Sequence, residues 1–439
     1  MTGPDDGISA TGADATGIAA PLDLPCGARL ANRLAKAPLT EGLADARNAP
    51  TVRHERLYGR WSAGGCALLV TGNVLVDRRY LERPGNVVIE DGAVPAAGLQ
   101  AYARAGTGAG TGAGTGAGTH LWMQINHAGR QTPEHLNPAP VGPSAVPLKL
   151  KGGYGAPRAL EAAEIADIVD RFAFAAGVAR ETGFTGVQIH AAHGYLLSEF
   201  LSPLANRRQD EWGGPLENRA RLLLETVAAV RRTVGADFPV SVKLNSADFQ
   251  KGGFSHAECL QVVGWLNAAG VDLLEISGGN YEQPSMMGVR VLDADGQAEN
   301  AVASVAASTA AREAYFLDYA ASIAPVAKMP LMVTGGFRTA AGMTAALASG
   351  AADVIGLGRP LCAEPDLAAR LLSGAADGVP LYENAIQPKR AGMAWFALQL
   401  LRMGDGLDPD LAMDGETAER LYRENELAAA AALADRTAA

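Results

Sequence analysis

Short apolar runs recur along the chain, and each is followed by a longer stretch in which apolar residues return every three or four positions. Runs of this length that are rich in Val, Ile and Leu predict buried β-strands. Their near-continuous apolar character indicates strands that are covered on both faces, as in a parallel sheet. Eight such runs are present, at residues 33–40, 66–74, 120–127, 186–192, 240–246, 272–279, 330–336 and 353–360.

The stretches between the runs predict amphipathic helices. After the fourth run, apolar residues from Leu216 to Val234 repeat at helical spacing, and Pro215 stands directly ahead of them, where a proline fits a helix start. Eight strands that alternate with helices predict an α/β fold, most simply a closed (β/α)8 TIM barrel. A doubly wound open sheet is the alternative, although such sheets usually stop at five or six strands.

The two ends of the chain differ from this alternation. Residues 1–20 are rich in Gly, Ala, Thr and Asp and predict a disordered tail. The barrel is expected over residues 21–380. Residues 381–439 predict a C-terminal helical extension of two or three helices, which would either cover the active-site mouth or build a subunit interface. The pattern does not choose between these roles.

A glycine-rich segment at residues 106–118, GTGAGTGAGTGAG, shares only its composition with a nucleotide-binding loop. Its glycines occupy even-numbered positions alone, so the GxGxxG spacing never occurs, and the segment precedes a strand instead of joining a strand to a helix. We interpret it as a flexible low-complexity loop.

Charge and cysteine usage narrow the classes of function. The formal net charge of -10, without a basic run, argues against nucleic-acid or anionic-membrane partners. Four scattered cysteines form neither a CxxC pair nor a disulfide framework, which favours a reducing compartment. The acidic N-terminus does not resemble a signal peptide, and no run reaches the roughly 18 apolar residues of a membrane span. A soluble, cytoplasmic protein is expected.

Polar residues gather where the predicted strands end, which is where barrel active sites lie. The last two strands end in Gly335-Gly336 and in Gly358-Arg359. Glycine turns at these two places fit a phosphate site, because backbone N–H groups can approach the phosphate closely where there is no side chain. An arginine can also bind the phosphate through two hydrogen bonds. The alternative is that the glycines serve only two tight turns.

The fourth strand runs into His190, His193 and Tyr195, an unusual concentration in a chain with seven histidines. One interpretation is a histidine that is simply hydrogen-bonded in the core. This would account for one histidine more easily than for two histidines and a tyrosine together. A metal site with Glu199 as a third ligand is a second interpretation, although metal-dependent barrel hydrolases tend to carry His-x-His on the first strand, which has no histidine here. The third is an electrophilic site, in which two imidazoles hold a carbonyl oxygen and a tyrosine donates a proton, since its reference pKa is about 10.

Several segments resemble the Old Yellow Enzyme family, the flavin-dependent ene-reductases also called NADH:flavin oxidoreductases. NRLAKAPLT resembles the first strand of that family and QINHAGR the third, while residues 183–219 resemble its most distinctive run. VTGGFRT and ADVIGLGRP resemble its phosphate-binding ends, and the similarity spans residues 22 to 380. The resemblance implies FMN contacts at Ala37, Pro38, Leu39, Thr40, Gly72, Gln124, Lys243, Gly335, Gly336, Phe337, Gly358 and Arg359.

The resemblance also implies individual roles. Thr40 would lie near the O4/N5 edge of the flavin and Gln124 at its pyrimidine edge. Lys243 would lie near N1–C2=O, where many relatives have arginine, and a lysine there is a point charge without a fork. Gly335, Gly336, Phe337, Gly358 and Arg359 would hold the FMN phosphate.

The implied reaction is ping-pong. NAD(P)H passes hydride to FMN, and an α,β-unsaturated carbonyl compound then takes hydride at its β-carbon. His190 and His193 would bind its carbonyl oxygen, and Tyr195 would protonate the α-carbon. NAD(P)H and an activated alkene are therefore the expected small-molecule partners, and a homodimer or larger homo-oligomer is one possible assembly. The alternative function is a metal-dependent barrel hydrolase or lyase that uses His190, His193 and Glu199.

Three departures from the family pattern limit what carries over. The branch that holds an iron–sulfur cluster needs four clustered cysteines near the end of the barrel and beyond it, and Cys362 is the last cysteine of this chain and stands alone there. Asn126 and Gly42 stand where some relatives have aromatic residues, so the pocket should differ in shape and the substrate preference cannot be transferred.

Overall fold

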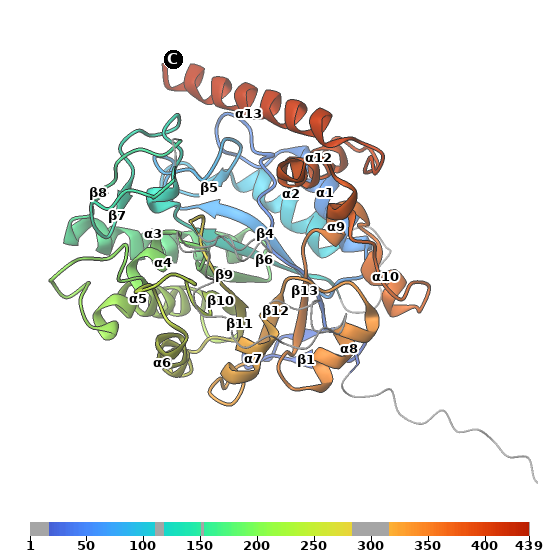
Figure 1. Cartoon of the computed structure of the whole chain (residues 1–439), viewed down its shortest axis with the longest axis horizontal. Coiled ribbons are helices and arrows are strands. Elements are labelled where there is room, and N and C mark those ends of the chain that lie inside the picture. Colours follow the sequence, from blue (N-terminus) through green and yellow to red (C-terminus); the bar gives the residue numbers. More distant parts are fainter. Residues whose placement is uncertain (1–16, 110–117, 151–152, 283–315, 439) are drawn as a thin grey trace, which may run out of the picture.

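The computed structural model describes residues 17–109, 118–150, 153–282 and 316–438. Eight parallel strands form a closed barrel, because β3 pairs with β4 at one end of the strand order and with β13 at the other; β5 is a short ninth strand beside β4 (Figure 1). Every predicted run coincides with one barrel strand, and β4 extends one residue beyond its run. The barrel strands are β3 (Leu34–Lys36), β4 (Leu68–Leu75), β6 (His120–Asn126), β9 (Gly186–Ala191), β10 (Val240–Asn245), β11 (Leu273–Ser277), β12 (Leu331–Thr334) and β13 (Val354–Leu357), and β5 is Val87–Val88.

Helices cover the outside of the barrel (Figure 1). The predicted helix after the fourth strand is confirmed as α5, and Pro215 is its N-cap residue with extended backbone. The helices along the barrel are α1 (Val52–Ala63), α2 (Ala96–Thr107), α3 (Ala162–Glu181), α4 (Leu196–Leu201), α5 (Leu216–Val234), α6 (His256–Leu266), α7 (Leu317–Ile323), α8 (Ala340–Ala348), α9 (Pro360–Ala363) and α10 (Leu367–Leu372).

Strand residues alternate between the inside of the barrel and the helices. On β9, Val187 and Ile189 join the outer core against the helices, while Gln188 bonds across the interior, as the alternation predicts. The amino end of the interior is apolar and includes Trp122 and Leu273. A hairpin of β1 (Leu22–Asp23) and β2 (Arg29–Leu30) precedes the barrel, and Leu30 packs into this apolar cluster. The interior is therefore filled at its amino end, and polar chemistry is confined to the carboxyl end, here called the mouth.

Two boundaries differ from the sequence expectations. Gly17 accepts a turn hydrogen bond from Ala20, which is 8% exposed, so these residues belong to the folded body and not to the expected tail of residues 1–20. Gly106 and Thr107 end helix α2, so the glycine-rich loop begins after them. The remaining tail and loop expectations fall on residues 1–16 and 110–117, which lie outside the described residues.

The C-terminal part is helical, as expected. It contains α11 (Tyr382–Ala385), α12 (Gly392–Gly404) and α13 (Gly415–Ala438), with a 3-10 turn η4 at Lys389–Ala391. A further two-stranded sheet, β7 (Val141–Gly142) with β8 (Arg158–Ala159), lies in the connection that follows β6, after the 3-10 turn η1 (Gly129–Gln131). Within the described part of the chain, none of the helices is both long and apolar enough to cross a membrane.

Candidate active site at the carboxyl end of the barrel

A connected layer of polar side chains crosses the barrel interior above the apolar floor. The Gln124 amide donates to Gln188 at 2.8 Å, and the Gln188 amide donates to Glu275 at 2.9 Å. Glu275 also accepts from Thr334 at 2.7 Å and pairs with the Lys243 ammonium at 2.9 Å. We call these five residues the interior polar layer. Neighbouring strands bring them together, since Lys243 stands in register with Glu275 on β11.

His190, His193 and Tyr195 converge at the mouth. The ring centroids of His190 and His193 are 5.1 Å apart, and those of His190 and Tyr195 are 4.8 Å apart. The Tyr195 hydroxyl lies 2.8 Å from the hydroxyl of Tyr281, which comes from the segment after β11. The structure therefore brings together the three residues that the sequence singled out, and it adds a second phenol.

His193 has a left-handed backbone with φ of 63°, which is uncommon for a residue with a side chain. Its N–H donates to Asn245 Oδ1 at 3.1 Å, and its Nε2 lies 2.6 Å from Ser277 Oγ. These two bonds, from the ends of β10 and β11, hold the ring in place. A non-glycine residue in this region often marks a functional site.

The protonation states suit hydrogen-bond donation to an oxygen. Burial and the nearby Lys243 charge hold the pKa of His190 and of His193 well below 6.5, so both rings are neutral at neutral pH. His190 Nδ1 accepts from the Ala192 N–H at 3.2 Å, which leaves the hydrogen on Nε2. Burial and the Glu82 carboxylate raise the pKa of Tyr195 well above 10, so its phenol keeps its proton.

The end of β3 forms one side of the mouth. Pro38, Leu39 and Thr40 are half-buried there, whereas Ala37 is buried in the interior cluster. Thr40 donates to Glu82 at 2.8 Å, and the Asn73 amide donates to the same carboxylate oxygen at 2.7 Å.

Gly72 lies where β4 passes close to this end of β3. A Cβ at Gly72 would lie 2.4 Å from the Leu39 carbonyl oxygen, and its N–H donates to Glu41 at 2.9 Å. Close packing requires a glycine at this position, and its N–H already has a partner within the protein.

The carboxyl ends of β12 and β13 carry the predicted phosphate residues. Gly335 and Gly336 have positive φ of 118° and 88°, which only glycine adopts readily. The Phe337 ring is 1% exposed and lies in the core, so only its backbone could face a ligand. Gly358 lies beside Leu39, whose side chain would be 3.7 Å from an added Cβ.

Two arginines share one carboxylate at this end. Arg359 lies 3.2 Å and Arg338 lies 2.7 Å from the same oxygen of Glu383 on α11. Two guanidinium groups therefore lie beside the two glycine turns. These guanidinium groups and the close backbone approach fit a phosphate group.

The residues of the metal interpretation do not form a metal site. Glu199 points toward the segment after β6, where its Oε1 accepts from the Arg130 N–H at 2.9 Å, while His193 bonds to Ser277. Burial raises the pKa of Glu199 to about 8, so it is largely protonated at neutral pH and a poor cation ligand. Over residues 17–109, 118–150, 153–282 and 316–438, no three His, Cys, Asp or Glu side chains are grouped to hold a metal ion.

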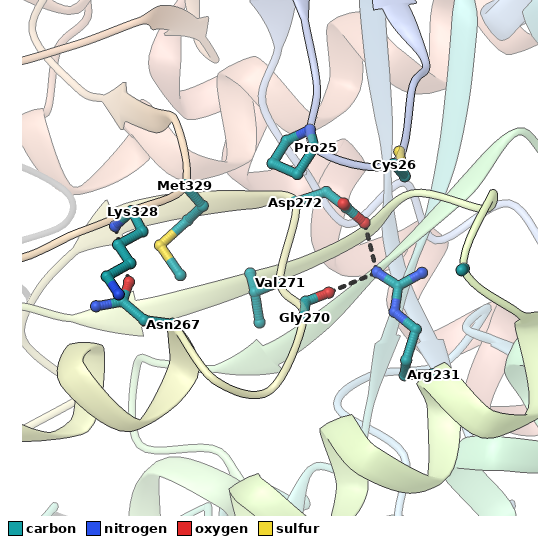
Figure 2. Close-up of a pocket in the computed structure, with 10 residues that line it drawn as sticks. Pro25, Cys26, Arg231, Asn267, Gly270, Val271, Asp272, Lys328 and Met329 are labelled. Carbon is teal, nitrogen blue, oxygen red and sulfur yellow. Dashed lines mark hydrogen bonds and ion pairs between the residues drawn. The ribbon is translucent and has the colours of Figure 1, made fainter.

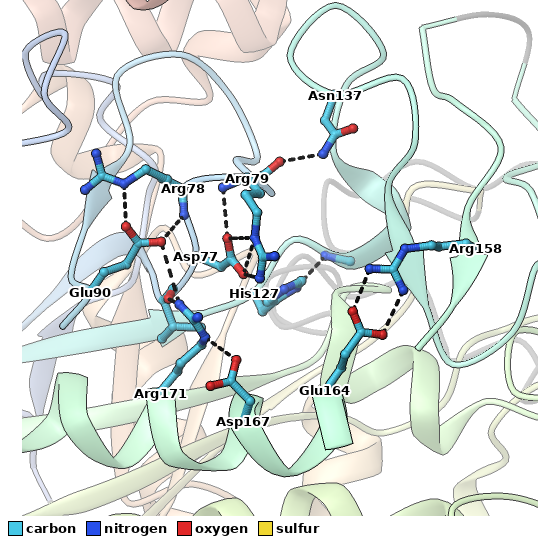
Figure 3. Close-up of polar contacts among 12 residues, drawn as sticks. Asp77, Arg78, Arg79, Glu90, His127, Asn137, Arg158, Glu164, Asp167 and Arg171 are labelled. Carbon is cyan, nitrogen blue, oxygen red and sulfur yellow. Dashed lines mark hydrogen bonds and ion pairs between the residues drawn. The ribbon is translucent and has the colours of Figure 1, made fainter. Parts of the chain in front are cut away.

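Two surface hollows are lined by residues other than those that converge at the mouth. One of about 380 Å³ is at the amino ends of β10 and β11, where Figure 2 shows Arg231 bonded to Asp272 and to the Gly270 carbonyl. The other, of about 320 Å³, lies against α3 and is lined by ion-paired side chains and His127 (Figure 3). His127, which directly follows β6, packs its ring 5.1 Å from that of Tyr80.

Sequence reasoning missed five residues of the site: Glu275, Ser277, Arg338, Glu82 and Tyr281. Glu275 had a signal, because a carboxylate interrupts the apolar run at 272–279. Arg338 had one too, since it directly follows the glycine pair. Glu82 and Tyr281 lie in connections between elements, where periodicity carries no information about contacts.

Known proteins resemble this chain over most of its length. The model of the NADH:flavin oxidoreductase / NADH oxidase family matches residues 18–378. The NADH-dependent flavin oxidoreductase iliE of Hypocrea jecorina (strain QM6a) is 36% identical over 365 residues, which cover 79% of this chain and 86% of that protein. The NADH-dependent flavin oxidoreductase nadA of Aspergillus parasiticus is 34% identical over 417 residues, 90% of this chain and 87% of that one. The iliE protein of Neonectria sp. (strain DH2) is longer, and the matched region spans 45% of it.

Solved structures show the same barrel. Morphinone reductase in complex with tetrahydroNAD matches with a TM-score of 0.65 and 27% identity, over 83% of this chain and 92% of that one. The Old Yellow Enzyme homologue of Zymomonas mobilis matches with a TM-score of 0.66 and 26% identity, over 84% and 95%. These matches confirm the resemblance seen in the motifs. The chain belongs to the NADH:flavin oxidoreductase / NADH oxidase family, and its barrel is that of the Old Yellow Enzymes.

Proposed function

We propose that this chain is an FMN-dependent NAD(P)H:flavin oxidoreductase that reduces the C=C bond of α,β-unsaturated carbonyl compounds in a ping-pong reaction. The observation that carries the proposal is the convergence of neutral His190, neutral His193 and protonated Tyr195 at the barrel mouth. The names of the relatives, which include NADH-dependent flavin oxidoreductases and morphinone reductase, support the same chemistry.

The mouth offers a place for FMN that agrees with the residues named from the sequence. Pro38, Leu39 and Thr40 present a half-buried surface on which a flat ring could lie, and Gln124 of β6 and Lys243 of β10 belong to the interior polar layer. The glycine turns with Arg359, and with Arg338 in addition, would hold the phosphate. FMN, when bound, supplies the hydride chemistry between the nicotinamide and the alkene.

The two histidines would bind the carbonyl oxygen of the alkene substrate. His190 can donate from Nε2, and the Ser277 hydroxyl orients the His193 ring. As hydride reaches the β-carbon, negative charge develops on this oxygen, and donors already in place stabilise that charge more than the ground state. Tyr195, held by Tyr281, would then donate its proton to the α-carbon.

Lys243 would favour the anionic reduced flavin. Its ammonium is already paired with Glu275, so the interior polar layer fixes its position and partly offsets its charge. The electrostatic effect on a flavin should therefore be smaller than that of an unpaired cation.

Absorption spectroscopy of the purified protein tests the proposal. A flavin band should bleach under anaerobic NADPH and return when 2-cyclohexenone is added, which reports both half-reactions. If the flavin band bleaches with NADPH and does not return with the enone, the protein is an NADPH:flavin oxidoreductase that does not reduce enones. A colourless protein that cannot take up FMN would refute the proposal, and sensitivity to chelators would then revive the metal-dependent alternative.

A further inference from the structure

The C-terminal helix α13 contacts the segment between β4 and β5 through a partly buried ion pair. Arg83 of this segment lies 2.5 Å from Glu426 of α13, and the side chains are 11% and 22% exposed. The Arg83 guanidinium also lies 5.2 Å from the ring centroid of Tyr422 on α13. Gly42 leaves room for the Arg83 side chain, because a Cβ at Gly42 would lie 2.8 Å from the Arg83 guanidinium.

The segment that α13 contacts belongs to the mouth. Glu82, the neighbour of Arg83, binds Thr40 and Asn73 at the ends of β3 and β4. Burial raises the pKa of Tyr195 and of Tyr422, and the Glu82 carboxylate adds to both shifts, which agrees with a position of Tyr422 near the carboxylate that faces the proposed proton donor.

A second contact of α13 lies further along the helix. Leu433 is half-buried and packs against a small apolar cluster that contains Leu81, Ala128 and Tyr195, with Tyr281 at its edge. Leu433 lies eleven positions after Tyr422, which is about 16 Å along a helix and close to three full turns. Both side chains therefore lie on one face of α13, and Figure 1 shows this helix, in red, running along the edge of the molecule past β5.

The burial pattern of α13 agrees with a single covered face. Glu426 and Leu433 are half-buried, whereas Glu424 and Leu427 are exposed. The exposed pair Arg420–Glu424 on the other face has side chains that are 59% and 58% accessible, so it should contribute little. The first turns of α13 pack against η4 and the main core, where Arg390 pairs with Glu419, and the contacts further along the helix reach Arg83 and the cluster of Tyr195.

We propose that α13 forms the outer wall of the substrate pocket, and that Tyr422 and Leu433 limit the size of the alkene that reaches Tyr195. The choice of alkenes as probes rests on the proposed function. The helix would exclude bulky substituents on the side of Tyr195 and Tyr281, while a small cyclic enone would fit beneath it.

The test compares two enones of different size, 2-cyclohexenone and 4-phenyl-3-buten-2-one. Leu433→Ala and Tyr422→Ala should raise the ratio of kcat/KM for the larger enone over the smaller one by roughly tenfold or more, the scale on which pocket volume discriminates substrates. Leu427→Ala and Glu424→Gln are the matched controls and should leave the ratio unchanged. Glu426→Gln, which keeps the helix and removes the charge of the pair with Arg83, should shift the ratio in the same direction by a smaller factor.

The outcomes separate this inference from the proposed function. An unchanged ratio in folded Leu433→Ala and Tyr422→Ala would overturn the wall assigned to α13. If the wild-type protein bleaches with NADPH and reduces neither enone, the proposed function fails instead. The wall is then tested by the flavin absorbance change on binding phenol and 4-tert-butylphenol, and it stands only if Leu433→Ala favours the larger phenol.

Discussion

Glu275 is the centre of the interior polar layer, and its replacement by glutamine tests that layer. Its carboxylate is fully buried and accepts from Gln188, Thr334 and Lys243 at distances of 2.7 to 2.9 Å. In Glu275→Gln, one oxygen becomes an NH2 group, so at least one donor faces another donor whichever way the amide turns. Lys243 also loses its counter-charge within the barrel. Removing one partner of a buried ion pair costs about 3–5 kcal/mol.

This free energy corresponds to a measurable change in melting temperature. The entropy of unfolding scales at about 2.1 cal/mol/K per residue, or roughly 0.9 kcal/mol/K for 439 residues, so the expected loss is roughly 3–5 °C. Differential scanning calorimetry of the apoprotein measures it without any contribution from a cofactor. The matched control is Glu225→Gln, because Glu225 pairs with Arg221 on the exposed face of α5, with side chains 47% and 38% accessible.

A double-mutant cycle separates the ion pair from the other bonds of Glu275. If unpaired charge is the main cost, Lys243→Met in the Glu275→Gln background should recover part of the lost stability. The reasoning would be refuted if Glu275→Gln melted within 1 °C of the Glu225→Gln control, a margin of about 1 kcal/mol on the same scale.

Three further predictions concern the mouth and its surroundings. Tyr195→Phe should spare the bleaching of the flavin by NADPH and slow its reoxidation by 2-cyclohexenone by roughly 10²–10⁴-fold in stopped-flow experiments, and an equal loss in both half-reactions would contradict its role as proton donor. His190→Ala should weaken the binding of phenols, measured by flavin absorbance titration, because a phenolate oxygen would take the place of the carbonyl oxygen; unchanged affinity would remove His190 from the site. Glu199 has a folded pKa of about 8 against an ordinary value of 4.5, so it contributes stability that is fully present below pH 4.5 and is lost as the pH rises through 8. The melting temperature of the wild type should therefore fall relative to Glu199→Gln between pH 5 and pH 8, and parallel pH profiles would show that this carboxyl ionises normally.

The barrel could be predicted because its strands are covered on both faces. A parallel strand between an apolar interior and a layer of helices has to be apolar along its length, so each of the eight runs stands out from its surroundings. Helix α5 was predicted for a similar reason, since its buried face repeats at helical spacing from Leu216 to Val234 and Pro215 stands directly ahead of it. These signals are local and need no knowledge of contacts across the chain.

The position of His190, His193 and Tyr195 at a common mouth also followed from the sequence alone, since residues at the end of a barrel strand must face the same opening. Only the tertiary structure decided which groups meet them there. Glu82 and Tyr281 reach the mouth from connections, and Arg83 meets Glu426 across 343 positions of sequence. The sequence left the C-terminal helices with two possible roles, and the structure places α13 against the mouth. Side chains in the connections between elements follow no sequence periodicity. Their partners depend on how distant helices and strands pack together, so these contacts could be found only in the folded chain.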